Sequence, residues 1–145
     1  MKVAFACDHA GFVLKEAVVA HLKEMGHDVV DFGCYTPERV DYPAQGEKAA
    51  RAVASGECQL GVLICGTGIG ISLAANRVRG IRAAVCSESY SAELTRRHND
   101  ANMIAFGARV VGEGTACAIL DAFFGAQFEG GRHAQRVAML DEIRP

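Results

Sequence analysis

The sequence predicts a doubly wound α/β fold, in which helices cover both faces of a five-stranded parallel sheet. Short apolar runs of strand length alternate with segments of helical periodicity along the whole chain. The runs are apolar at nearly every position, which is typical of parallel strands buried on both faces. The length of 145 residues, with 50% hydrophobic residues, suits a single domain over residues 1–145 with one sizeable core.

Five apolar runs have the length and composition of strands. Each run is followed, directly or after a loop, by a segment of helical periodicity. In chain order the runs are "VAFAC" (3–7), "DVVDF" (28–32), "LGVLIC" (60–65), "IRAAVC" (81–86) and "NMIAFG" (102–107). Because helical segments separate them, we expect these strands to run parallel.

Helical periodicity fills the intervals between the runs. Residues 12–26 place apolar side chains on one face, and Gly26 suits the position just after a helix end. We expect Gly56 to end the next helix in the same way, and Ser87 is a plausible N-cap for the helix after the fourth strand. In chain order the expected helices are 12–26, 44–56, about 70–77, 88–97, 114–128 and 132–143.

The charge balance and the cysteines argue against several classes of function. With 15 basic and 17 acidic side chains the net charge is −2, which argues against a nucleic acid or a polybasic membrane contact as the main partner. The 6 cysteines are widely spaced and form no C-x-x-C pair, so a zinc or thioredoxin-type site has no support in their spacing. We expect no metal and no cofactor. The apolar run at the N-terminus is too short for a signal peptide, and no stretch reaches ~18 apolar residues. We therefore expect a cytoplasmic protein with reduced thiols.

The predicted architecture also locates a candidate site. In an open parallel sheet, ligands bind outside the carboxyl ends of the strands, where the strand order reverses. Residues that follow a strand are therefore the first candidates. They are Asp8, His9, Tyr42 in the loop after the second strand, the stretch Cys65 to Gly70, Ser87 and Glu88.

The stretch "CGTGIG" (65–70) lies between a buried strand and the start of a helix, a combination that forms an anion site. A dinucleotide-binding fingerprint needs G-x-G-x-x-G, but Ile71 stands where its last glycine belongs, although Glu88 has about the spacing of the acidic residue. A phosphotyrosine-phosphatase loop needs an arginine at the position of Ile71. The third interpretation is a reactive thiolate beside an oxyanion cradle, because the field at a helix N-terminus favours an ionised thiol.

Cys65 also has a plainer interpretation, in which it closes a buried strand as Cys7 and Cys86 do. A free cysteine is commonly a small core residue, so this alternative stays open. If Cys65 is reactive, its spacing does not distinguish a covalent nucleophile from a general base.

The other polar candidates have structural interpretations as well. Asp8 suits the N-cap of the first helix. His98 and Asn99 close a helix, where a positive charge complements the dipole and asparagine suits the cap. Arg132 and Arg136 share a helix face by their i, i+4 spacing. That face is either solvated or an anion clamp, because two like charges at this spacing are mildly unfavourable without an anion.

Five segments together resemble one family, the type B ribose-5-phosphate isomerases, which are grouped with bacterial galactose-6-phosphate isomerase subunits. The segments occur in the family's order and span nearly the whole chain, so their agreement is far more specific than the glycine loop alone. They are "DHAGFVLK" (8–15), "DYP" (41–43), "CGTGIGISLAANRVRGIRAA" (65–84), "RRHNDANMIAFGARVVG" (96–112) and "GGRHAQRV" (130–137).

The resemblance implies an aldose–ketose isomerase that interconverts ribose 5-phosphate and ribulose 5-phosphate through an enediolate. Cys65 is then the base, His98 opens the sugar ring, Thr67 orients groups within the loop, and Asp8 binds sugar hydroxyls and aids proton transfer. Contacts to the enediolate or the sugar hydroxyls are implied for Asp8, Tyr42, Gly66, Thr67, Gly68, Ile69, Gly70 and Asn99. The residues implied to hold the phosphate are His9, Arg109, Arg132 and Arg136.

The resemblance also implies a homodimer with shared sites, or a tetramer built from such dimers. In the family, the C-terminal arginines and the His-Asn segment reach the site of a neighbouring subunit. The nearest alternative function is the same chemistry on a six-carbon aldose 6-phosphate, such as allose or galactose 6-phosphate. A non-catalytic sugar-phosphate-binding module is a more distant alternative, because a binder does not need Cys65, His98 and Asp8 together.

Overall fold

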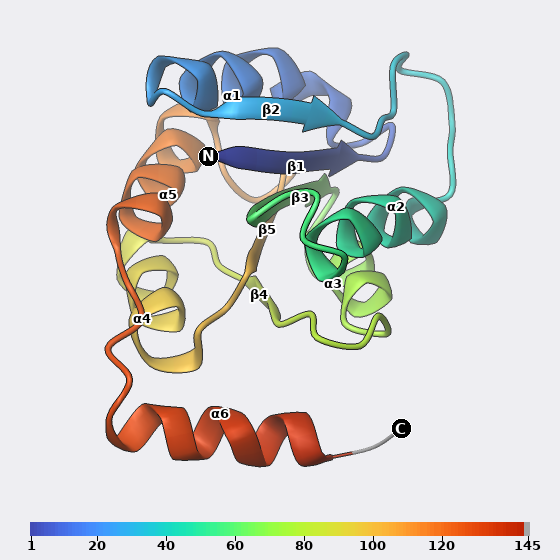
Figure 1. Ribbon diagram of the computed structural model, residues 1–145. Coiled ribbons are helices and arrows are strands. Elements are labelled where there is room, and N and C mark those ends of the chain that lie inside the picture. Colours follow the sequence, from blue (N-terminus) through green and yellow to red (C-terminus); the bar gives the residue numbers. More distant parts are fainter. Residues whose placement is uncertain (144–145) are drawn as a thin grey trace.

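All five strands expected from the sequence pair in one parallel sheet in the computed structural model, which describes residues 1–143 (Figure 1). The order across the sheet is β2-β1-β3-β5-β4. The strands are β1 (Lys2–Cys7), β2 (Asp28–Asp31), β3 (Leu60–Cys65), β4 (Ala83–Val85) and β5 (Met103–Gly107). The central strands β1, β3 and β5 are buried at nearly every position, which explains their continuous apolar runs. The predicted fold class is confirmed, while the expected domain end at residue 145 lies outside the described residues.

Helices cover both faces of this sheet. Leu22 of α1 and Phe123 of α5 pack with Phe5 in the core on one face. On the other face, Ala49 of α2 and Ile71 of α3 pack over the sheet. Within the described residues the helices are α1 (Phe12–Glu24), α2 (Tyr42–Ala54), α3 (Ile69–Ala75), α4 (Ser89–Asn99), α5 (Glu113–Gly125) and α6 (Arg132–Glu142). None of these helices is long and apolar enough to cross a membrane.

Helix α6 lies outside both layers and follows the lower edge of the molecule in Figure 1. It is joined to the rest of the domain by two buried side chains, His133 and Val137. Near its other end, Asp141 pairs with Arg82 at 3.0 Å. Most of the remaining surface of α6 is exposed.

The strand order reverses between β1 and β3. From β1 the chain passes through α1 to β2 at one edge, and it returns through α2 to β3 on the other side of β1. The carboxyl ends of β1 and β3 are neighbours, because Cys7 stands beside Ile64 and the N–H of Asp8 donates to the Ile64 carbonyl at 3.1 Å. This crevice is where ligands bind in such sheets, and Asp8 and Cys65 both lie at it.

Element boundaries lie within three residues of the predicted ones, and the larger shifts have identifiable reasons. The strand predicted over 81–86 shortens to β4, because Arg82 donates its N–H to the side chain of Asn102 at 2.9 Å. The helix predicted over 44–56 begins at Tyr42, since the proline that follows is tolerated in a first turn.

Two caps proposed for α4 are wrong. Ser87 is not its N-cap: Glu88 takes that position, and its carboxylate accepts the N–H of Ser91 at 2.9 Å. Asn99 is not the C-cap either, but the last helical residue. Asp100 follows it in the left-handed conformation with φ of 48° and ends the helix.

Candidate active site

The glycine loop at the carboxyl end of β3 places a backbone donor against the sulfur of Cys65. Cys65 is the last residue of the strand and is 4% exposed. Gly68 precedes α3 in the left-handed conformation with φ of 80°, and its N–H donates to Cys65 Sγ at 3.1 Å. This donor stabilises negative charge on the sulfur atom, which is the atom that carries the charge in a thiolate.

Three further N–H groups of the loop are available to a ligand. In the part of the chain that the structure describes, the backbone N–H groups of Gly66, Thr67 and Gly70 donate to no protein acceptor. The hydroxyl of Thr67 accepts the N–H of Ile69 at 3.2 Å, so this side chain braces the loop. Unpaired donors beside a sulfur atom suit an oxyanion that forms next to Cys65.

The loop geometry makes a prediction about Gly68. Gly68→Ala is expected to destabilise the protein by about 1–3 kcal/mol, because its positive φ is strained for any residue with a side chain. The added methyl group would also lie 2.8 Å from backbone atoms of Phe106. Gly114→Ala is the control, since its methyl group meets nothing within 4 Å. Urea denaturation measures both variants, and equal free energies of unfolding would contradict the described loop.

Two residues that follow β1 are fixed beside the loop. Asp8 is buried, and its carboxylate accepts the N–H of Gly11 at 3.0 Å. Gly11 itself is the N-cap of α1, so Asp8 is not the cap of that helix but supports the turn before it. Nδ1 of the His9 ring lies within hydrogen-bond distance of both backbone groups of Val40, 3.3 Å from the nitrogen and 3.2 Å from the carbonyl oxygen. Both side chains are thereby held at the carboxyl edge of the sheet.

Tyr42 and Arg109 flank the loop from two other elements. Tyr42 begins α2, and its ring lies so close to Gly70 that a methyl group there would be 2.8 Å from the ring. Arg109 follows β5, its N–H donates to the Gly66 carbonyl at 3.1 Å, and its guanidinium lies against the same glycine. The structure therefore brings together Asp8, His9, Tyr42, Arg109 and the loop from Cys65 to Gly70.

His98 and Asn99 lie at the opposite edge of the sheet, the edge where the strands begin. They form the C-terminal end of α4, and the chain continues from there into the amino end of β5. Cys65 stands beside Gly107, at the carboxyl end of the same strand. The length of β5, about 13 Å, therefore separates the two edges. One chain does not bring His98 to Cys65.

Arg132 and Arg136 lie at the same edge of the sheet as His98. The segment before α6 is tied to the end of α4, because the N–H of Glu129 donates to the Arg97 carbonyl at 3.0 Å. Both arginines of α6 are exposed, and neither has an acidic partner among residues 1–143. The predicted site residues thus form two groups on opposite edges of one chain.

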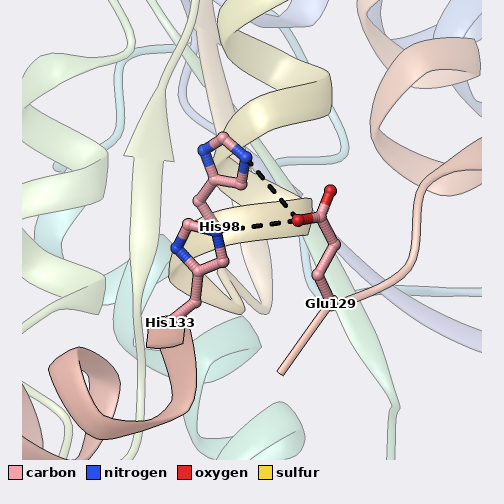
Figure 2. A group of neighbouring side chains, drawn as sticks. All are labelled: His98, Glu129 and His133. Atoms are coloured by element: carbon pink, nitrogen blue, oxygen red, sulfur yellow. Dashed lines mark ion pairs between the residues drawn. The ribbon is translucent and has the colours of Figure 1, made fainter. Parts of the chain in front are cut away.

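Sequence reasoning missed two residues of the second group, Glu129 and His133. Their side chains meet that of His98, and the donor atoms of all three lie within 4.8 Å of one another (Figure 2). These residue types are able to bind a metal ion. The i, i+4 spacing of Glu129 and His133 is a weak signal in the sequence, and only the packing of α6 on α4 adds His98 to the pair.

Comparison with known proteins decides the family. A protein-family model described as "Ribose/Galactose Isomerase" matches residues 3–140. The chain belongs to this family. Among curated proteins, the "Ribose-5-phosphate isomerase B" of Escherichia coli (strain K12) is 58% identical, over 98% of this chain and 95% of its own length.

Other members of the ribose/galactose isomerase family extend this agreement. The "Galactose-6-phosphate isomerase subunit LacB" of Clostridium acetobutylicum is 40% identical, over 99% of this chain and 83% of its own length. A solved structure of ribose-5-phosphate isomerase B from Clostridium thermocellum has a TM-score of 0.96 and 54% identity, over 98% of this chain and 96% of its own. The family and the fold predicted from the sequence are both confirmed.

Proposed function

We propose that this protein interconverts ribose 5-phosphate and ribulose 5-phosphate, with Cys65 as the base. The observation that carries the proposal is the donor N–H of Gly68, 3.1 Å from Cys65 Sγ, in a loop with further free donors. Family membership supplies the reaction class, and the loop supplies a base and an anion site in one place. This reaction belongs to the non-oxidative branch of the pentose phosphate pathway.

The proposed chemistry moves a proton between neighbouring carbons of the open-chain sugar. The Cys65 thiolate removes the proton from C2 of ribose 5-phosphate, and the electrons of that bond move toward the C1 carbonyl to give the enediolate. The proton on O2 moves to O1 with the help of Asp8. The thiol then returns its proton to C1, which leaves the ketone at C2. Meanwhile the N–H groups of Gly66, Thr67 and Gly70 stabilise the negative oxygen.

A neighbouring subunit completes the site in this proposal. His98 donates a proton to the ring oxygen as the furanose opens, because a histidine side chain is able to act as a general acid. One chain holds His98 and Cys65 on opposite edges of its sheet. Each chain must therefore contribute its His98 to the site that contains Cys65 of the other chain. We therefore propose a homodimer with shared sites, or a tetramer of two such dimers. Tyr42 and Asn99 contact sugar hydroxyls, and the phosphate clamp combines His9 and Arg109 of one chain with Arg132 and Arg136 of the other.

Exposed apolar side chains support an interface that includes both groups of site residues. Ile69 and Leu73 on α3 are exposed beside the glycine loop. Met139 and Leu140 are exposed on α6, the helix that carries the two arginines. Removal of apolar surface from water is the main favourable term in most protein association, so these residues are suited to a subunit interface.

The location that we propose is the cytoplasm. All six cysteines are free thiols, although the sulfur atoms of Cys7 and Cys34 lie only 3.8 Å apart. Reduced thiols at such short range suit a reducing compartment.

Steady-state kinetics on two sugars tests the proposed function. We expect kcat/KM on ribose 5-phosphate to exceed that on allose 6-phosphate by at least about tenfold, because a misfitted carbon group costs about 1–3 kcal/mol in a shaped site. A higher value on allose 6-phosphate or galactose 6-phosphate would assign a six-carbon substrate instead. Binding of ribose 5-phosphate without turnover of any of these sugars would identify a non-catalytic binding module.

A further inference from the structure

His98, Glu129 and His133 form a cluster where the end of α4 meets the start of α6 (Figure 2). The imidazole rings of His98 and His133 stack, with centroids 4.2 Å apart and planes 9° from parallel. Oε2 of Glu129 lies 3.6 Å from Nε2 of His133 and 3.9 Å from Nε2 of His98. One carboxylate oxygen thus faces the edges of both rings.

Arg97 holds the Glu129 carboxylate in place. Its Nε donates to Oε1 of Glu129 at 2.6 Å, and Glu93 pairs with the same guanidinium at 2.8 Å from the other side. The hydrogen bond from Arg97 lowers the pKa of Glu129, so the carboxylate is ionised at neutral pH. Because Arg97 occupies Oε1, Oε2 is left to face the two imidazoles.

His133 is the inner ring of the stack. It is 5% exposed, and burial lowers its pKa, with a further contribution from the charges of His98 and Arg132. Its Nε2 has no hydrogen-bond partner within residues 1–143, since 3.6 Å to Glu129 is too long for one. The neutral ring does make flat contact with His98, whose side chain stays 32% exposed. The buried ring of His133 therefore limits the rotation of the more exposed ring of His98.

The geometry of this cluster suits a histidine ring held in one orientation better than it suits a metal site. Two histidines and a glutamate are common zinc ligands, and a bound ion lies on the in-plane lone pair of each imidazole nitrogen. Rings that are 9° from parallel and 4.2 Å apart share no such point. One ring would have to turn before the cluster chelated an ion.

We propose that Glu129 and His133 are positioning residues for His98; this inference rests on the proposed function, in which His98 opens the sugar ring. His133 sets the plane of the His98 ring through the stack. Glu129 sets its tautomer, because an ionised oxygen that faces Nε2 stabilises a proton on that nitrogen. Nδ1 of His98 then carries, in the protonated ring, the proton that passes to the ring oxygen of the sugar.

Kinetics in the two directions tests this positioning. Ribose 5-phosphate is mostly a furanose and must be opened, whereas ribulose 5-phosphate cannot close through its phosphorylated 5-hydroxyl. We expect His133→Ala and Glu129→Gln to lower kcat at saturating ribose 5-phosphate by about 10- to 100-fold. This is less than the about 10²- to 10⁴-fold of a whole general acid–base contribution, because His98 itself is kept. With saturating ribulose 5-phosphate, kcat should stay within about threefold of wild type, because no ring opening is needed. His133→Phe keeps the flat contact and should recover most of the loss.

Asp121→Asn is the matched control for Glu129→Gln. It removes the same charge from another histidine–carboxylate pair, the exposed pair of His21 and Asp121 at 2.7 Å. Neither rate should change in this variant. Equal losses of kcat in both directions for Glu129→Gln and His133→Ala, or no loss at all, would overturn the positioning role.

The protonated nitrogen of His98 gives a second readout that does not need turnover. Long-range ¹H–¹⁵N correlation spectra should show the neutral wild-type ring with its proton on Nε2, and Glu129→Gln should move population toward Nδ1–H. A wild-type protein without turnover overturns the proposed function, while an unchanged ring in Glu129→Gln overturns the positioning. Calorimetry with zinc ions tests the alternative of a metal site. Zinc binding by the wild type that is lost in His133→Ala would make the cluster a metal site and overturn the proposal. The absence of zinc binding would support the positioning role.

Discussion

Replacing Cys65 with alanine is expected to abolish isomerisation and to leave the affinity for substrate within about tenfold of wild type. In the proposed mechanism the thiolate removes a proton that moves only in the chemical step, so kcat should fall far more than the affinity for substrate. The structure gives the sulfur one directed donor, the N–H of Gly68 at 3.1 Å. Initial rates with both sugars measure turnover, and calorimetry with ribose 5-phosphate measures the affinity of the inactive variant.

Cys86→Ala is the matched control for this experiment. Cys86 is buried to 5% exposure, close to the 4% of Cys65, but burial and the charge of Glu88 raise the pKa of its thiol to about 11. It therefore stays protonated at neutral pH and is inert, and its loss should leave kcat unchanged. If Cys65 were only a core residue, the two variants would behave alike. Appreciable turnover of ribulose 5-phosphate by Cys65→Ala would remove Cys65 from the role of base.

The turn from strand to helix at residues 65–70 is the part of the candidate site that local sequence predicts well. A buried strand that runs into glycines must turn, and the first N–H groups of the following helix have no partners within the helix. The donor contact between Gly68 and Cys65 is a consequence of that local geometry. Asp8 is predicted for a related reason, because it follows the neighbouring buried strand.

Contacts between distant segments explain what local sequence does not predict. Arg82 leaves the fourth strand because its N–H donates to Asn102, 20 residues along the chain. Glu129 and His133 become partners of His98 only when α6 packs on α4 (Figure 2). The order of the strands depends in the same way on pairings that no single segment contains.

Mixing two inactive variants is expected to restore activity if neighbouring chains share their sites. One variant carries Cys65→Ala, and the other carries Arg132→Ala together with Arg136→Ala. Each charge-assisted contact to phosphate is worth about 1.5–3 kcal/mol, so the double arginine variant should lose more than about 100-fold in kcat/KM. Each variant alone is therefore inactive at substrate concentrations below the wild-type KM.

The hybrid dimer distinguishes the two possible origins of the phosphate clamp. The topology keeps Cys65 at the carboxyl edge of the sheet and ties α6 to the end of α4 at the amino edge. If the clamp serves the neighbour, one site of the hybrid combines an intact Cys65 with intact arginines, and the other site collects both defects. If the clamp serves its own chain, each site of the hybrid holds one defect.

Activity after subunit exchange is the measurement. Random exchange at equal concentrations makes half of the dimers hybrid, and one of two sites in each hybrid is intact, so about a quarter of wild-type activity is expected. Exchange is verified by native mass spectrometry. A mixture of Cys65→Ala with a chain that carries all three substitutions is the control, and it should stay inactive because no intact Cys65 is present. An inactive hybrid after verified exchange would mean that each chain builds its own site. Arg132 and Arg136 would then have to reach Cys65 of the same chain at the opposite edge of the sheet.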